Sequence, residues 1–220
     1  AIFKAYTDEA SYRAREDAPW EILFSREVGA YEIIEGWLQN SKARAQGASR
    51  VFVPPTVETL LVHEGRNYGV GSLQEFQEGF RTAREIQNES PEIWANLMGN
   101  ADFQRSLNRM RTLDWLLGNY DRWPNSVFTQ GNFGNFMIRI PDGNLARAEI
   151  ALIDNGIGQG RLSSFWLRDL PATETIPADL RRVILDLDLE AFAAMNQDRL
   201  SSIAITDFLT RVRALRERLR

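Results

Sequence analysis

The sequence contains no cysteine and a single histidine, His63. Without cysteine the chain can form no disulfide, no thiolate nucleophile and no cysteine-ligated zinc site. One histidine cannot supply both a serine-type triad and a zinc site, and its setting, HEGRN, is typical of a turn. Cysteine-based redox chemistry and cysteine-based nucleophilic catalysis are therefore excluded. Nothing near His63 indicates catalysis.

Strong charge of one sign and long apolar runs are also missing. The formal net charge is −4 over 220 residues, and without a general basic surface we expect no nucleic-acid partner. No stretch approaches the roughly 18 consecutive apolar residues of a membrane span, and the opening AIFKAYTDEA lacks the pattern of a signal peptide. These absences predict a cytoplasmic protein. The chain starts with Ala1, which leaves open whether residues have been removed upstream.

Hydrophobic residues make up 44% of the chain and charged residues 25%, which is typical of a globular protein with a sizeable core. Residues 1–6 are expected to end a strand. Residues 19–40 are expected to form a helix, because apolar residues recur there at helical spacing: Trp20, Phe24, Val28, Tyr31, Ile34 and Leu38. Glu27 lies within this apolar face, and a buried carboxylate is costly unless a cation or a proton compensates it. Lys4 is the obvious candidate for that cation.

Further along, the pattern changes from strand-rich to helix-rich near residue 72. Residues 51–70 predict two strands around a turn at 63–67, followed by a linker over 71–79. A helix is predicted over 90–117, starting at Ser-Pro, and the chain from about 177 is again helical. Between them, residues 136–154 predict a hairpin around PDGN, since Asp-Gly between alternating apolar residues is a strong hairpin signal. Antiparallel pairing would place Asn135 and Asp154 at the same end of this ribbon.

Three polar positions in this half of the chain indicate a site. Asp121 lies in LLGNYDRWPN after the predicted helix, Asn135 lies in GNFGN before the hairpin, and Asp154 lies in IDNGIG after it. Alone, Asp121 with Arg122 could be a surface ion pair and Asp154 a turn residue. Together they suit phosphoryl transfer from ATP, in which oxygen ligands hold Mg²⁺ and a separate carboxylate accepts the proton of the attacking hydroxyl.

Several short motifs, taken in order, resemble the atypical kinases of the phosphatidylinositol 3-/4-kinase-like superfamily: IFKAY, REVGAY, VPPTVE, GSLQEF, GNYDRWPN, GNFGNFMI and IDNG. Members include the type II phosphatidylinositol 4-kinases, the actin-fragmin kinase, HipA-like toxin kinases and secretory-pathway casein kinases. The resemblance covers roughly residues 2–158. It implies an α+β, bilobal protein-kinase-like fold. Residues 1–75 would be a small, apparently truncated, strand-rich N-lobe with the hinge, and residues 76–220 a helical C-lobe with the catalytic loop and the metal-binding hairpin.

The resemblance also implies roles on the nucleotide side. Lys4 would contact the ATP phosphates, and Glu27 would pair with it. Gly71, Ser72 and Leu73 would belong to the hinge, at 69–76, that meets the adenine.

On the catalytic side, the resemblance implies that Asp121 is the catalytic acid and that Arg122 helps to fix its loop. Asn135 and Asp154 would hold Mg²⁺ or Mn²⁺. Fourteen positions separate Asp121 from Asn135, whereas the ordinary kinase loop places its asparagine about five positions after the aspartate. Asn125 is therefore a rival ligand. Asn135 is preferred because it directly precedes the apolar strand FMI, as the metal asparagine does in the family.

The favoured function is an ATP-dependent phosphotransferase that moves the γ-phosphate to a hydroxyl, with Ser or Thr of a protein as the favoured acceptor. A phosphoinositide kinase is an alternative, although apart from the basic C-terminal helix the sequence shows no cationic face for a membrane. A nucleotide-binding pseudokinase acting as an interaction module is another. It is favoured by the three residues before Lys4, which leave no room for a Gly-rich loop over the phosphates. The sequence does not predict the oligomeric state.

Overall fold

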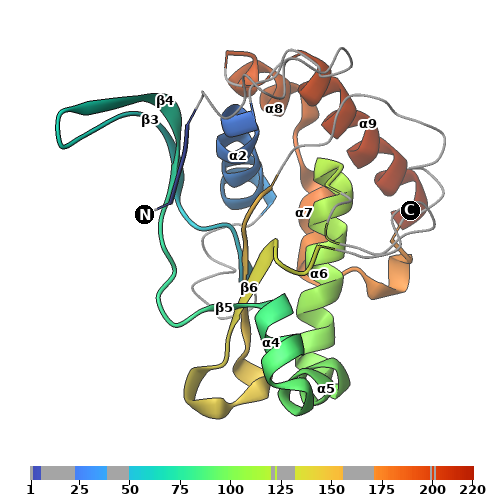
Figure 1. Ribbon diagram of the computed structural model, residues 1–220. Coiled ribbons are helices and arrows are strands. Elements are labelled where there is room, and N and C mark those ends of the chain that lie inside the picture. Colours follow the sequence, from blue (N-terminus) through green and yellow to red (C-terminus); the bar gives the residue numbers. More distant parts are fainter. Residues whose placement is uncertain are drawn as a thin grey trace.

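The computed structural model describes residues 2–5, 23–38, 50–119, 122, 132–155, 171–198, 200 and 202–220, and it shows a mixed α+β fold (Figure 1). Two small sheets lie beside a group of helices. Among the described residues, no helix is long and apolar enough to cross a membrane. The predicted α+β class is therefore confirmed at this coarse level.

The first sheet contains three antiparallel strands in the order β1-β4-β3, with bounds Ile2–Ala5, Arg66–Gln74 and Thr56–His63. The predicted hairpin is confirmed, with its turn at Glu64 and Gly65, which both have positive φ. In Figure 1 the hairpin extends away from the helices.

The prediction of a linker over 71–79 is wrong for its first four residues. They belong to β4, where pairing with β1 on one side and β3 on the other holds a segment of low strand propensity in the sheet. The side chain of Gln74 reinforces this pairing by donating to Thr56 Oγ1 at 3.0 Å.

The second sheet has the order β2-β7-β6-β5, with bounds Val51–Phe52, Glu149–Leu152, Phe136–Arg139 and Arg81–Thr82. Strands β6 and β7 form the predicted hairpin, connected by two 3-10 turns, Pro141–Gly143 and Leu145–Arg147. Phe136 pairs with Leu152, and the N–H of Ile153 donates to the carbonyl of Asn135 at 3.2 Å. The residues around Asn135 and Asp154 thus meet at one end of the ribbon.

The predicted N-terminal helix is confirmed over its described part, as α2 (Leu23–Tyr31) and the π-helix η1 (Glu32–Leu38). Helix α4 (Ala83–Glu89) was not predicted, and a capping box at Thr82 and Glu85 starts it.

The predicted helix 90–117 is two helices, α5 (Pro91–Gly99) and α6 (Ala101–Leu117). Asn100 separates them because its extended backbone ends α5. Its side chain then accepts from the backbone N–H groups of Asp102 and Phe103, so the same residue caps α6.

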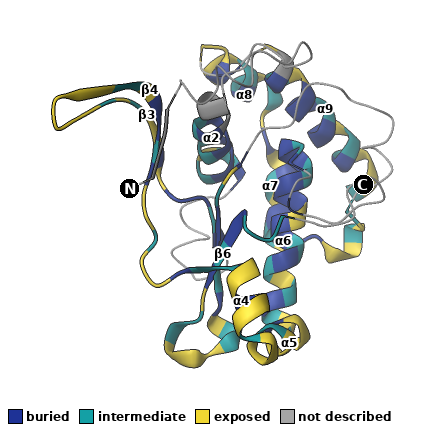
Figure 2. Cartoon of the chain, viewed as in Figure 1, coloured by how far each residue is buried: buried dark blue, intermediate teal, exposed yellow. Residues whose placement is uncertain are grey.

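The C-terminal part is helical as predicted, with α7 (Ala178–Asp186), α8 (Leu189–Asn196) and α9 (Ser202–Leu219). Figure 2 shows buried residues on α2, α6, α7 and α9 where they face one another. One continuous apolar cluster joins α2 and η1 to the second sheet and these helices. Trp37 of η1, for example, packs edge-on against Phe192 of α8, with ring centroids 5.3 Å apart. The predicted boundary near residue 75 falls just after β4, and the division into two lobes stays a prediction.

Candidate functional site

Arg122 is the centre of the polar site, and its side chain is completely buried. The guanidinium forms an ion pair with Asp114 of α6, which is 1% exposed. A buried charge is tolerated only when it is paired and its remaining donors find acceptors.

Three more acceptors complete the shell of Arg122. Nε donates to the carbonyl of Asn135 at 2.9 Å, and Nη2 donates to the carbonyl of Ile153 at 2.7 Å and to Asn155 Oδ1 at 2.5 Å. Arg122 thereby joins the end of α6 to the start of β6 and the end of β7.

Asn155 extends this connection to α2. It is fully buried, and its side chain amide donates to the carbonyl of Leu152 at 2.9 Å. Its backbone N–H donates to Glu27 Oε2 at 2.9 Å, across 128 positions of the sequence. Glu27 is 5% exposed, as predicted from its place on the apolar face. We call Glu27, Asp114, Arg122, Asn135 and Asn155 the Arg122 network.

Asp154 lies at the rim of the Arg122 network, and its side chain is exposed. Its φ is +54°, a left-handed conformation that a non-glycine residue adopts only when its surroundings determine it. The surroundings are the buried Asn155 after it and Asn119, whose Nδ2 donates to the Asp154 carbonyl at 3.4 Å. The backbone therefore presents the Asp154 carboxylate outward at some conformational cost, which is a common feature of functional positions.

Helix α9 supports the chain where α6 ends. Gly118 ends α6 in a left-handed conformation, with φ +70°. The Arg211 guanidinium lies so close that a Cβ on Gly118 would be 2.6 Å from Nη2.

Arg211 is buried with Asp207, whose carboxylate lies 3.8 Å away. Burial lowers the pKa of the Arg211 guanidinium, while Asp207 opposes that shift. Burial likewise raises the pKa of the Asp207 carboxyl above its ordinary value, and Arg211 offsets this only in part.

The donor set at the rim fits a hard divalent cation. Asn135, 7% exposed, and Asp154 offer amide and carboxylate oxygens at adjoining strand ends, and Mg²⁺ is usually held by one or two such groups together with phosphates and water. Among the described residues, no three Asp, Glu, His or Cys side chains lie close enough together to hold a metal. A metal site here would thus depend on the amide and on a nucleotide, and the ligands named from the sequence stay a prediction.

Other predicted residues fall outside the described part of the chain. These are Asp121, the rival ligand Asn125, and the side chain of Lys4. The backbone of Lys4 pairs with Ser72 across β1 and β4. The ion pair predicted between Lys4 and Glu27 therefore stays a prediction.

The predicted hinge residues Gly71, Ser72 and Leu73 lie in the central strand β4. They pair with β1 on one side and with β3 on the other, and their role in a hinge stays a prediction. Residues 75–79, which follow β4, lie outside the regular strands.

Sequence reasoning missed Asp114, which carried a signal, and Asn155, which did not. Asp114 lies on the apolar stripe of its helix beside Leu113 and Leu117, as Glu27 does on α2. A buried acid in such a place is costly unless a cation pairs with it. Asn155 lies in the motif IDNG, where Asn-Gly is typical of a turn. Its burial follows from the position of β7 between β2 and β6 in the sheet.

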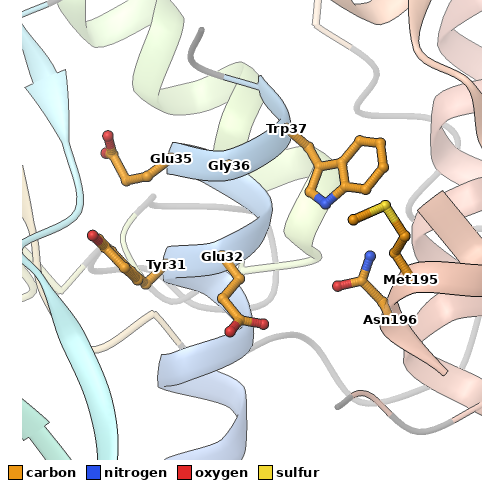
Figure 3. A pocket seen from close by; sticks show the side chains of 7 residues that line it. All are labelled: Tyr31, Glu32, Glu35, Gly36, Trp37, Met195 and Asn196. Carbon is orange, nitrogen blue, oxygen red and sulfur yellow. The ribbon is translucent and has the colours of Figure 1, made fainter. Parts of the chain in front are cut away.

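One cavity of about 360 Å³ lies beside the Glu27 helix and contains none of the predicted site residues (Figure 3). Glu35 points away from Trp37 and Met195 in this view, and its Oε1 accepts from the backbone N–H of Val53 at 2.8 Å. Because Glu35 binds the backbone directly after β2, we assign it a structural role. The lining residues are Tyr31, Glu32, Glu35, Gly36, Trp37, Met195 and Asn196.

Comparison with known proteins gives no match for this chain, either to a protein-family model or to a curated protein. The functional interpretation therefore rests on the residues and on their geometry.

Proposed function

We propose that the chain is an atypical kinase with a bilobal kinase-like fold that transfers the γ-phosphate of ATP to a hydroxyl group. The observation that carries this proposal is the Arg122 network. Through it, one buried guanidinium holds the backbone at Asn135 and Ile153, so the two proposed metal residues lie at adjoining strand ends. A turn or a surface ion pair would need no such buried connection, because both are stable in water.

Asn135 and Asp154 would hold Mg²⁺ or Mn²⁺, which when bound with ATP neutralises charge on the phosphates. Arg122 acts as a positioning residue, because it is buried behind Asn135 and Asp154 and its donors bind protein acceptors. Asp121, directly before it in the chain, would orient the acceptor hydroxyl and accept its proton. Rigid support of this kind is what phosphoryl transfer requires, since its catalysis depends on positioning and electrostatics.

Glu27 has two tasks in this proposal. It would hold Lys4 against the phosphates, and its observed bond to the Asn155 N–H ties α2 to the residue after Asp154. A displacement of α2 would therefore move the proposed phosphate-binding and metal-binding residues together. Within the proposed hinge at 69–76, Glu75 and Phe76 would meet the adenine with their backbone, because the backbone of Gly71, Ser72 and Leu73 is paired in the sheet.

The test is transfer of radiolabelled phosphate from ATP with Mg²⁺ or Mn²⁺. Acceptors are the protein itself, generic protein substrates and phosphoinositide vesicles. Asp154→Asn keeps the side chain size and tolerates positive φ. Its matched control is Asp142→Asn, because Asp142 is an exposed aspartate with φ +52° in the connection between β6 and β7.

We expect Asp154→Asn and Asp121→Asn to lower transfer by at least about 100-fold, whereas Asp142→Asn leaves it unchanged. Label on protein supports the favoured acceptor, and label in lipid alone would identify a phosphoinositide kinase. Nucleotide binding without transfer would mean a pseudokinase. Equal transfer by Asp154→Asn and Asp142→Asn would overturn the assignment of Asp154.

A further inference from the structure

A second polar cavity, of about 460 Å³, lies between the first half of α6 and the start of α7. Its charged lining consists of Arg50, three residues of α6 (Asp102, Arg105 and Arg109) and Asp179 of α7, with Ser106 beside them. The volume falls in the range of small-molecule pockets, about 300–1,000 Å³.

The cavity has one more positive charge than negative. Arg105 pairs with Asp102, and the buried Arg109 pairs with Asp179. Arg50 is partly buried, and among the described residues no acid pairs with it. Its Nη1 is buried without a hydrogen-bond partner. A buried donor without a partner is costly, so a ligand that supplies an acceptor to Arg50 Nη1 would be bound favourably.

The start of α7 adds to this positive character. Its N-cap is Pro177, whose side chain makes no capping hydrogen bond. The N–H groups of a first helical turn carry a partial positive charge and bind anions. Asp179 partly balances this charge, but its carboxylate is already occupied by Arg109. An anionic ligand in this cavity would therefore bind most favourably beside Arg50.

This cavity is distinct from the proposed catalytic centre. The carbonyl of Arg50 accepts from the N–H of Ile150 at 2.7 Å, so Arg50 lies near the start of β7, whereas Asp154 follows its end. At about 3.3 Å per strand residue the two are separated by about 13 Å along β7.

We propose that this cavity binds the phosphate group of a small molecule, with Arg50 as the main recognition residue. A guanidinium suits phosphate because its planar set of N–H donors matches the oxyanion geometry. The proposal stands independently of the kinase proposal, because it uses none of the proposed catalytic residues.

The test is calorimetric titration of the full chain with inorganic phosphate and with glycerol 3-phosphate, each against chloride at equal ionic strength. Arg50→Gln removes the excess charge and keeps a polar side chain of similar length. The matched control is Arg147→Gln, because Arg147 is 59% exposed and belongs to the connection between β6 and β7. The titration contains no Mg²⁺, so phosphate held through a metal at the proposed catalytic centre does not contribute.

We expect wild type and Arg147→Gln to bind alike, and Arg50→Gln to bind at least about tenfold more weakly. Tighter binding of glycerol 3-phosphate would identify a phosphorylated metabolite as the ligand, and equal or weaker binding would identify free phosphate. If Arg50→Gln fails to fold, Ser106→Asp places a negative group in the cavity and should weaken binding similarly. No binding by wild type, or equal binding by Arg50→Gln and Arg147→Gln, would overturn the proposal.

Discussion

Replacing Arg122 by Met should strongly destabilise the fold. The change removes the cation from Asp114, which is 1% exposed, and takes the buried donor from the carbonyl of Ile153 and from Asn155 Oδ1. Breaking a buried ion pair from one side costs about 3–5 kcal/mol. For a chain of this length that corresponds to a fall in Tm of roughly 6–20 °C. It is a large share of a typical stability of about 5–15 kcal/mol.

The assay is urea unfolding followed by tryptophan fluorescence, with thermal unfolding by circular dichroism as a second readout. The control is Arg81→Met, whose ion pair with Glu89 is short, at 2.7 Å, but exposed on both sides. That variant should lose less than about 1 kcal/mol.

The double variant Arg122→Met with Asp114→Leu tests whether the cost comes from the isolated charge. It should recover about 1–3 kcal/mol relative to Arg122→Met, because no unpaired carboxylate then stays buried. If Arg122→Met does not fold, Arg122→Lys provides the comparison. It keeps the charge and loses part of the hydrogen bonding, so an intermediate loss is expected. A loss from Arg122→Met no larger than that from Arg81→Met would refute the reasoning.

Three further predictions follow from neighbouring contacts. Gly118→Ala should cost more than Gly143→Ala, by about 1–3 kcal/mol in urea unfolding, because both glycines have φ +70° but a Cβ at 118 meets Arg211 while one at 143 meets nothing within 4 Å; equal losses would mean that Arg211 moves aside freely. The Tm of Asp207→Asn should rise relative to that of wild type as the pH rises. The reason is that a carboxyl whose folded-state pKa is raised by burial loses its stabilising contribution when it ionises. A Tm difference between the two proteins that does not change between about pH 3 and 8 would contradict the raised pKa. Glu27→Gln should keep the free energy of unfolding within about 1 kcal/mol of wild type, since the amide oxygen can still accept the Asn155 N–H that Glu27 binds. It should nevertheless lower phosphate transfer about tenfold or more, because the negative charge is lost. Retained transfer would show that Glu27 has a structural role alone.

Local chemistry made much of the architecture predictable. The strands around Glu64 and Gly65 and the hairpin of β6 and β7 follow from alternating apolar residues around residues that tolerate a turn. Their pairing then placed Asn135 near Asp154 without further information. Asn100 shows the limit of this reasoning, because an apolar stripe at constant helical spacing does not reveal a break at which the same residue ends one helix and caps the next.

The buried connections of the site could not be predicted in the same way. Glu27 was expected on a buried face, and it is there, but its bond to the Asn155 N–H joins residues 128 positions apart. No periodicity reaches that far. Arg122 was expected only to fix a loop, since arginine is usually exposed and its sequence neighbours gave no sign of a core.

The sequence by itself determined the mixed α+β class, the hairpins, the helical C-terminal part and the meeting of Asn135 and Asp154 at one strand end, because these depend on residues within one or two adjoining elements. Only the tertiary structure decided that β2 pairs parallel to β7, that Arg122 is buried against Asp114, and that Arg50 lies in a cavity with an excess of positive charge. Burial and charge balance depend on which distant segments pack together, and the free energy of a charged side chain changes with that packing far more than with its neighbours in sequence.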